Sequence, residues 1–208
     1  MMTSRASTIR NESNWRFGLL LAGIAFLIVA FLFLNFRAAA SHTEVEKNVM
    51  TAGIGEGLPD AMQRREKISL VLVGEGPLID ALQNFILTEM NQAGIGDIDP
   101  VQQILTEYQN PVLVVKVEQP DVLWTPLFAN SHFTIQAGYS STGDTTLIGE
   151  PPVTVDNRHG AALNMYGEYT IRDRSWGLIS RPAYHQSLAD SLAREIVASL
   201  KELYKVST

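Results

Sequence analysis

The chain contains no cysteine among its 208 residues. This absence excludes disulfide bonds, thiolate metal sites, a cysteine nucleophile and a lipid-modified N-terminal cysteine. Any folded domain in the chain must therefore be stabilised by packing and hydrogen bonding alone.

Basic side chains are scarce after residue 37, where 12 Lys and Arg stand against 21 Asp and Glu, a net charge of −9. An acidic region without a basic cluster argues against nucleic-acid binding, so we expect no nucleic-acid partner.

Recognisable catalytic and metal-binding motifs are also missing. The sequence holds no GxSxG, HExxH or SxxK motif, and none of its four histidines has an acidic or histidine partner at a ligand spacing on one element. Asp173 stands between two arginines in a segment that resembles a turn, and we interpret it as a solvated carboxylate. We expect a protein that is not an enzyme, with no catalytic residue, no cofactor and no metal.

One stretch of the chain is almost entirely apolar. Residues 17–36, FGLLLAGIAFLIVAFLFLNF, carry no charge. A helix of this length covers about 30 Å, the hydrocarbon thickness of a bilayer. Lys and Arg near its ends favour a cytoplasmic N-terminus. The sequence thus predicts an uncleaved, single-pass signal anchor in the cell membrane; a cleaved signal peptide, suggested by the alanines at 38–40, is the alternative. Gly18 and Ala22 form a small-residue pair that could support a helix-mediated homodimer.

The predicted domain organisation follows from this anchor. Residues 1–14 are polar and are expected to form a disordered cytoplasmic tail, and residues 15–37 the transmembrane anchor. Residues 38–66 contain AGIGEGLPD and are interpreted as a flexible stalk. Residues 67–208 are expected to form one extracytoplasmic domain.

Apolar periodicity within 67–208 predicts strands and two amphipathic helices. One helix begins near Pro77 and stops at Gly94, and the other begins at Ser187, where Asp190 three residues later suggests a capping box. Residues 95–110 are interpreted as connecting sequence, and 172–177 as a hairpin loop. Four segments are interpreted as strands: 68–73, 112–118, 133–139 and 163–171. The fold class is α+β: a two-layer sandwich of a mainly antiparallel sheet with two helices on one face, preceded by one N-terminal transmembrane helix.

An apolar loop, VLWTPLF at 122–128, is unusual for a surface segment. It either folds under the sheet or forms a docking or lipid-contact surface. We name Trp124, Phe128 and Trp176 as the candidate docking surface.

The segment GEYTIRDRSWGLISRPAYHQSLADSLAREIVASL, residues 167–200, resembles the end of a group of bacterial envelope domains. These are the auxiliary lipoproteins of ABC-type transporters and the lipopolysaccharide-assembly lipoprotein, which share an α/β sandwich. The resemblance spans about residues 67–204 and is one of element order. It implies an envelope location and no catalytic residue.

Together these features predict a membrane-anchored extracytoplasmic accessory protein of an envelope transport or assembly complex. Its expected partners are the lipid bilayer and a membrane or envelope protein complex. A binding module for lipid or another apolar ligand, and a membrane-tethered hydrolase, are the alternatives.

Overall fold

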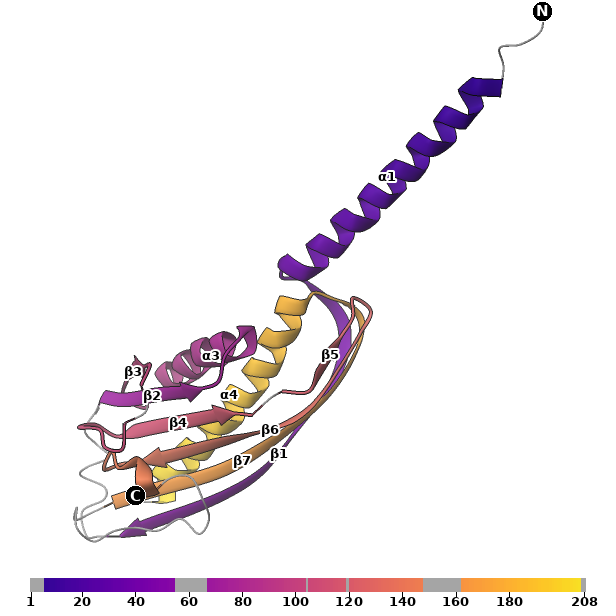
Figure 1. Ribbon diagram of the computed structural model, residues 1–208. Helices are drawn as coiled ribbons and strands as arrows, with labels where there is room; N and C mark the ends of the chain where they lie inside the picture. The colour runs from indigo at the N-terminus through magenta and orange to yellow at the C-terminus, as the bar shows by residue number, and fades with distance from the viewer. Residues whose placement is uncertain (1–5, 55–66, 104, 119, 148–161, 207–208) are drawn as a thin grey trace, which may run out of the picture.

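The computed structural model describes residues 6–54, 67–103, 105–118, 120–147 and 162–206. A seven-stranded mixed sheet is covered on one face by two helices, and a third helix, α1, projects from one end of the sheet (Figure 1). The α+β class and the placement of two helices on one face are confirmed. The elements are α1 (Ala6–Phe33), β1 (Arg37–Ile54), β2 (Lys67–Val73), α3 (Pro77–Ala93), β3 (Asp97–Val101), β4 (Val112–Val117), β5 (Val122–Trp124), β6 (Phe128–Ser140), a 3₁₀ turn η1 (Thr145–Leu147), β7 (Ala162–Ile179) and α4 (Arg181–Val206).

The sheet runs in the order β1-β7-β6-β4-β2-β3, and β5 pairs with the first residues of β6. Four of the six strand pairs are antiparallel, so the sheet is mainly antiparallel as predicted. The pairs of β2 with β3 and with β4 are parallel. Helix α3 supplies the crossover that a parallel β2–β3 pair requires. β3 itself corrects the interpretation of residues 95–110 as connecting sequence.

Helix α3 begins at Pro77, which suits the first turn of a helix, and apolar side chains follow at helical spacing. It ends at Gly94, whose left-handed φ of 70° turns the chain so that the N–H of Ile95 donates to the carbonyl oxygen of Met90 at 3.1 Å. Buried side chains of α3 and α4 meet over the sheet and leave no solvent-exposed surface between the layers. Those with 0% exposure include Leu82, Ile86, Met90, Leu188, Leu192, Ile196 and Leu200.

Helix α4 begins at Arg181, six residues before the predicted start at Ser187. The Oγ of Ser180 accepts a hydrogen bond from the N–H of Ala183 at 3.4 Å, so Ser180 takes the role of N-cap. Pro182 is tolerated because the first turn of a helix does not use its N–H. The capping box predicted at Ser187 is therefore wrong.

Strand β7 corrects a second prediction. Residues 162–179 form one continuous strand of 18 residues, and the segment 172–177, interpreted as a hairpin loop, lies within it. Its side chains alternate between the two faces, with Arg172 and Arg174 exposed and Asp173 and Ser175 buried. Asp173 is 2% exposed, so the interpretation of a solvated turn carboxylate is wrong.

Strand β1 changes the predicted domain boundary. Residues 37–54, the first part of the predicted flexible stalk, form an 18-residue strand that pairs with β7 along its whole length. The remainder of that predicted stalk, from residue 55, lies outside the described residues. The folded domain thus begins at Arg37.

Helix α1 spans Ala6–Phe33, so residues 6–14 of the predicted disordered tail are helical. Its large apolar side chains between Trp15 and Val29 are exposed, several of them by more than half. By length and hydropathy together, none of the helices in the described part of the chain qualifies as a membrane span.

Candidate functional site: the α1 end of the sheet

Helix α1 joins the sheet through only three residues, Leu34 to Phe36. The backbones of Phe36 and Ser180 are bonded through the Ser180 N–H and the Phe36 carbonyl oxygen at 3.0 Å, and the Phe36 N–H donates to Ser180 Oγ at 3.0 Å. The side-chain amide of Asn35 donates to Gln186 Oε1 at 2.7 Å, and the Arg37 guanidinium donates to Ser187 Oγ at 2.6 Å. The base of α1 is thereby attached to the start of α4.

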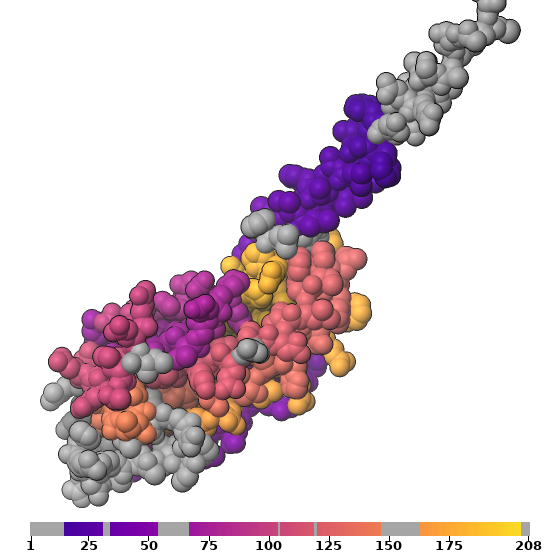
Figure 2. Space-filling view, viewed as in Figure 1, coloured from indigo at the N-terminus to yellow at the C-terminus, as the bar shows by residue number. Residues whose placement is uncertain are grey.

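Four further segments meet at this end of the sheet, which we call the α1 end. The antiparallel register brings the end of β7 beside the start of β1, with Arg37 opposite Ile179. The start of β6 lies beside the end of β7, with Phe128 opposite Trp176, and β5 covers the outer side of β6. In Figure 2 these β5 and β6 residues, in salmon, lie next to the base of α1 and the first turn of α4.

The structure separates the three residues of the predicted docking surface. Phe128 and Trp176 face each other across β6 and β7, with ring centroids 4.5 Å apart. Trp124 is partly buried against the core, and its indole Nε1–H donates to the carbonyl oxygen of Ile179 at 3.1 Å. Trp124 therefore anchors β5, while Phe128 and Trp176 lie together on the face of the sheet that the helices leave uncovered.

Exposed leucines enlarge the Phe128–Trp176 pair. Leu178 follows Trp176 by two residues on β7, and Leu123 of β5 is opposite Asn130, which follows Phe128 by two residues on β6. Alternate residues of a strand and directly opposite residues share a face of the sheet, so both leucines lie beside the pair. Leu127 is at the tip of the β5–β6 turn, which is closed by the Thr125–Phe128 hydrogen bonds and bound to β7 through the N–H of Gly177. The exposed fractions are 65% for Trp176, 63% for Leu127, 56% for Leu123 and 45% for Leu178. We call Leu123, Leu127, Phe128, Trp176 and Leu178 the aromatic surface.

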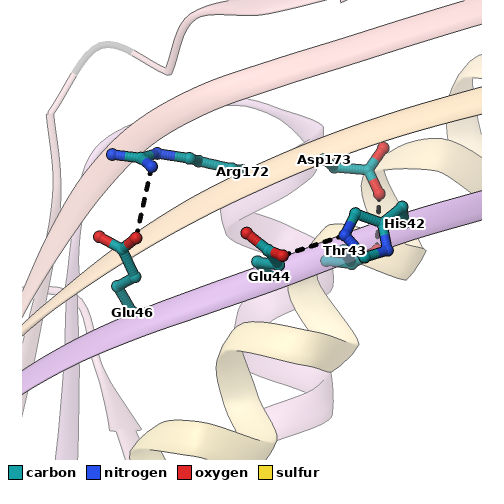
Figure 3. Close-up of polar contacts among 6 residues, drawn as sticks. All are labelled: His42, Thr43, Glu44, Glu46, Arg172 and Asp173. Carbon is teal, nitrogen blue, oxygen red and sulfur yellow. Dashed lines mark hydrogen bonds and ion pairs between the residues drawn. The ribbon is translucent and has the colours of Figure 1, made fainter.

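Beyond the aromatic surface the open face becomes polar. Arg172 Nη1 lies 3.3 Å from Glu46 Oε1, and His42 Nε2 lies 3.0 Å from Glu44 Oε1 (Figure 3). These side chains come from β1 and β7 and are more than half exposed. Exposed pairs of this kind contribute about 0–1 kcal/mol each, so they shape the surface charge more than they stabilise the fold.

On the opposite face, the same strands bury a carboxylate. Thr43 Oγ1 donates to Asp173 Oδ1 at 2.6 Å (Figure 3), and Ser175 Oγ donates to Asp173 Oδ2 at 2.9 Å. Ser41 Oγ continues the network to Ser175 at 2.7 Å. Within the described ranges no basic side chain forms an ion pair with Asp173, and the hydrogen bonds to its two carboxyl oxygens come from the hydroxyl groups of Thr43 and Ser175.

Helix α4 packs over this network through Tyr184, which lies near Asp173. Tyr184 is 1% exposed, and burial raises its pKa well above 10, with the nearby Asp173 carboxylate adding to the rise. The next residue, His185, is 7% exposed. Its pKa is lowered mainly by burial and also by the charge of Arg181. Asp173 is thus 2% exposed, and its hydrogen bonds to Thr43 and Ser175 link β1 to β7 at this end of the sheet.

The described residues contain no group of three His, Asp or Glu side chains placed to hold a metal ion. A shallow hollow lies between the base of α1, α3 and α4, lined by residues that include Asn35, Phe85, Gln186 and Arg194. Arg194 within it is engaged by Asp190 at 2.9 Å.

Sequence reasoning identified the aromatic residues but not how they are grouped. In residues 172–176 the buried positions hold Asp173 and Ser175, so no apolar alternation marks the inner face of β7. The contact between Trp176 and Phe128 depends on the register between two strand residues 48 positions apart in sequence, which no local pattern contains either.

No family model matches the chain, and no curated protein matches it. Among solved structures, the chain is similar to the PelC dodecamer from Paraburkholderia phytofirmans, with a TM-score of 0.38 and 14% identity over 75% of this chain and 95% of that chain. It is also similar to a minor lipoprotein from Acinetobacter baumannii, with a TM-score of 0.33 and 14% identity over 64% of this chain and 93% of that chain. Scores at this level do not establish a shared fold, so the function has to be argued from the chain's own residues.

Proposed function

We propose that this protein is a membrane-anchored, extracytoplasmic accessory protein of an envelope transport or assembly complex, and that it docks with its partner through the edge strand β1. The apolar run at 17–36 supports the anchor, and the excess of Lys and Arg before it supports a cytoplasmic N-terminus.

The observation that carries the docking proposal is the length and position of β1. It is an edge strand of 18 residues, while globular strands are about 5–6 residues long. A strand at the edge of a sheet presents unpaired N–H and C=O groups along its outer side, and natural proteins protect such edges unless a partner covers them. In the described part of the chain, β1 pairs with β7 alone.

Several features make β1 suited to accept a strand from another protein. Its register with β7 runs without a bulge from Arg37 to Ile54, and it contains no proline. Residues 38–41 of β1 carry only small side chains, and the exposed residues of its second half are Glu46, Lys47, Asn48, Thr51 and Gly53. An extended segment of a partner could add main-chain hydrogen bonds here and obtain specificity from alternate side chains.

The packed interior favours docking over the two alternatives. The described side chains between the sheet and the helices are buried, many of them with 0% exposure, which favours a packed core over a cavity for an apolar ligand. The most enclosed carboxylate, Asp173, is inaccessible to a substrate.

Topology is tested by fusing a reporter after Thr208. A reporter enzyme that works only outside the cytoplasm should be active in this fusion. A reporter that works only inside the cytoplasm should be inactive. The opposite pattern would contradict an extracytoplasmic domain.

Docking is tested with a photocrosslinking amino acid placed at Asn48 on β1, with Asn84 on α3 as the matched control. Both asparagines are exposed, so neither replacement disturbs the core. In intact cells, the Asn48 position should crosslink to one envelope protein in high yield, and the Asn84 position should not. Equal yields at the two positions, or none at either, would refute docking through β1.

A further inference from the structure

We infer that the aromatic surface is in contact with the bilayer: Leu127, Phe128 and Trp176 lie in the interfacial layer of the same membrane that α1 enters. This inference rests on the proposed anchor and extends it, because it makes the domain lie on the membrane surface rather than hang from a stalk.

The first argument is position. Only three residues separate α1 from β1, and hydrogen bonds from Asn35, Phe36 and Arg37 attach this joint to α4. Trp176 is opposite Ala40, three residues beyond Arg37, a span of about 10 Å along an extended strand. A membrane at the base of α1 therefore lies within reach of the aromatic surface.

The second argument is chemical character. Trp is enriched at the headgroup level of membranes because its ring is apolar and its indole N–H is polar. Trp176 combines 65% exposure with a contact to the tilted ring of Phe128 and three exposed leucines around it. Such a patch is costly in water, and it is located at the end of the domain where lipid is closest.

The third argument is charge. The segments that form the α1 end are residues 34–42, 120–131 and 173–187. They expose Arg37, Arg174 and Arg181 and a single carboxylate, Asp121, in a domain that is otherwise acidic. Basic side chains near a bilayer are attracted to phosphate headgroups and anionic lipids. Among the described residues, this group of exposed arginines thus lies at the same end of the domain as the aromatic surface.

The absence of cysteine makes the test direct, because each new cysteine can be labelled alone. Full-length protein carries a nitroxide at Leu127→Cys, Thr134→Cys or Ile24→Cys, in nanodiscs of phosphatidylcholine with or without phosphatidylglycerol. The readout is the accessibility of the nitroxide to oxygen, which partitions into lipid, and to a nickel chelate, which stays in water. Thr134 is the control, because it is exposed on the same strand about 20 Å further from α1.

We expect the label at Leu127 to be shielded from nickel at a depth of about 5–10 Å, as in interfacial helices, and the label at Thr134 to be fully accessible to it. Phosphatidylglycerol should increase the shielding at Leu127. Adding Trp176→Ser, an exposed position whose change leaves the core intact, should restore nickel access at Leu127 severalfold.

The outcomes separate this inference from the anchor itself. If the Ile24 label is shielded and the Leu127 label is as accessible to nickel as the Thr134 label, the anchor stands and the lipid contact is refuted. If the Ile24 label is accessible to nickel, both fail. Shielding of Leu127 in native membranes but not in pure lipid would assign the surface to a protein partner and would also overturn the inference.

Discussion

Gly177→Ala should detach the first residues of β1 from β7 and destabilise the domain by about 3 kcal/mol. Gly177 has a φ of +117°, a backbone conformation that residues with a side chain rarely adopt. A Cβ at this position would lie 2.6 Å from the carbonyl oxygen of Ala38 and 2.9 Å from the Cα of Ala39. Both atoms are backbone and cannot move aside without opening the ladder, so the strain falls on the joint between α1 and the sheet.

The measurement is hydrogen exchange of the β1 amides, together with urea unfolding of the full chain in detergent. Among the amides of β1 that bond to β7, protection should be lost within Ala38–Ser41 and retained toward the middle of the strand. Gly76→Ala is the matched control, because Gly76 also has a positive φ, +109°, but its Cβ would meet nothing within 4 Å. An equal loss of stability in the two variants would show that backbone strain, and not the contact with β1, is responsible.

Asp173→Ala is expected to cost about 3 kcal/mol of unfolding free energy, because it removes the acceptor for the hydroxyl groups of Thr43 and Ser175. The bond from Ser175 is buried and the bond from Thr43 is partly buried, so solvent compensates poorly for their loss. Asp173→Asn keeps the volume and one carbonyl oxygen, and should cost about half as much.

A double-mutant cycle with Thr43→Val isolates the network. The combined loss should be smaller than the sum of the single losses, because either change alone breaks the same bond. Thr134→Val is the control for removing an exposed hydroxyl from the open face, where the Thr134–Thr170 pair should contribute less than about 0.5 kcal/mol. Additive losses at positions 43 and 173 would contradict a shared network.

Elements whose apolar side chains recur at a regular period were predicted from the sequence. β2, β4 and α3 carry continuous or helically spaced apolar residues, and their cores form close to where that pattern indicated. The buried stripe of α4 was also correct. Periodicity is sufficient in these cases because each element buries one face, or both, in the same core.

β1 and the second half of β7 carry no such signal. Glu44, Glu46 and Lys47 make β1 resemble a polar linker, because its open face and its outer edge are both uncovered. In β7 the burial of Asp173 and Ser175 inverts the usual polarity of an inner face. Both strands form because they pair with each other over 18 residues, and the partners are about 130 positions apart.

The same limit applies to the candidate site. A loop containing Trp124 and Phe128 could be singled out because apolar loops are rare, and Trp176 was named together with it. That Trp124 would face the core and the other two would contact each other on the open face depends on which residues of β5, β6 and β7 are opposite each other.

The direct connection between α1 and β1 also restricts how copies of this chain can associate. Two β1 strands paired antiparallel about a two-fold axis would place their α1 helices at opposite ends of the joined sheet. Helices that point in opposite directions cannot both enter one bilayer from the same side, so a pair of anchored chains is barred from closing this edge symmetrically. Attachment to a membrane would then protect a long exposed strand from self-assembly while leaving it open to a strand from a different protein.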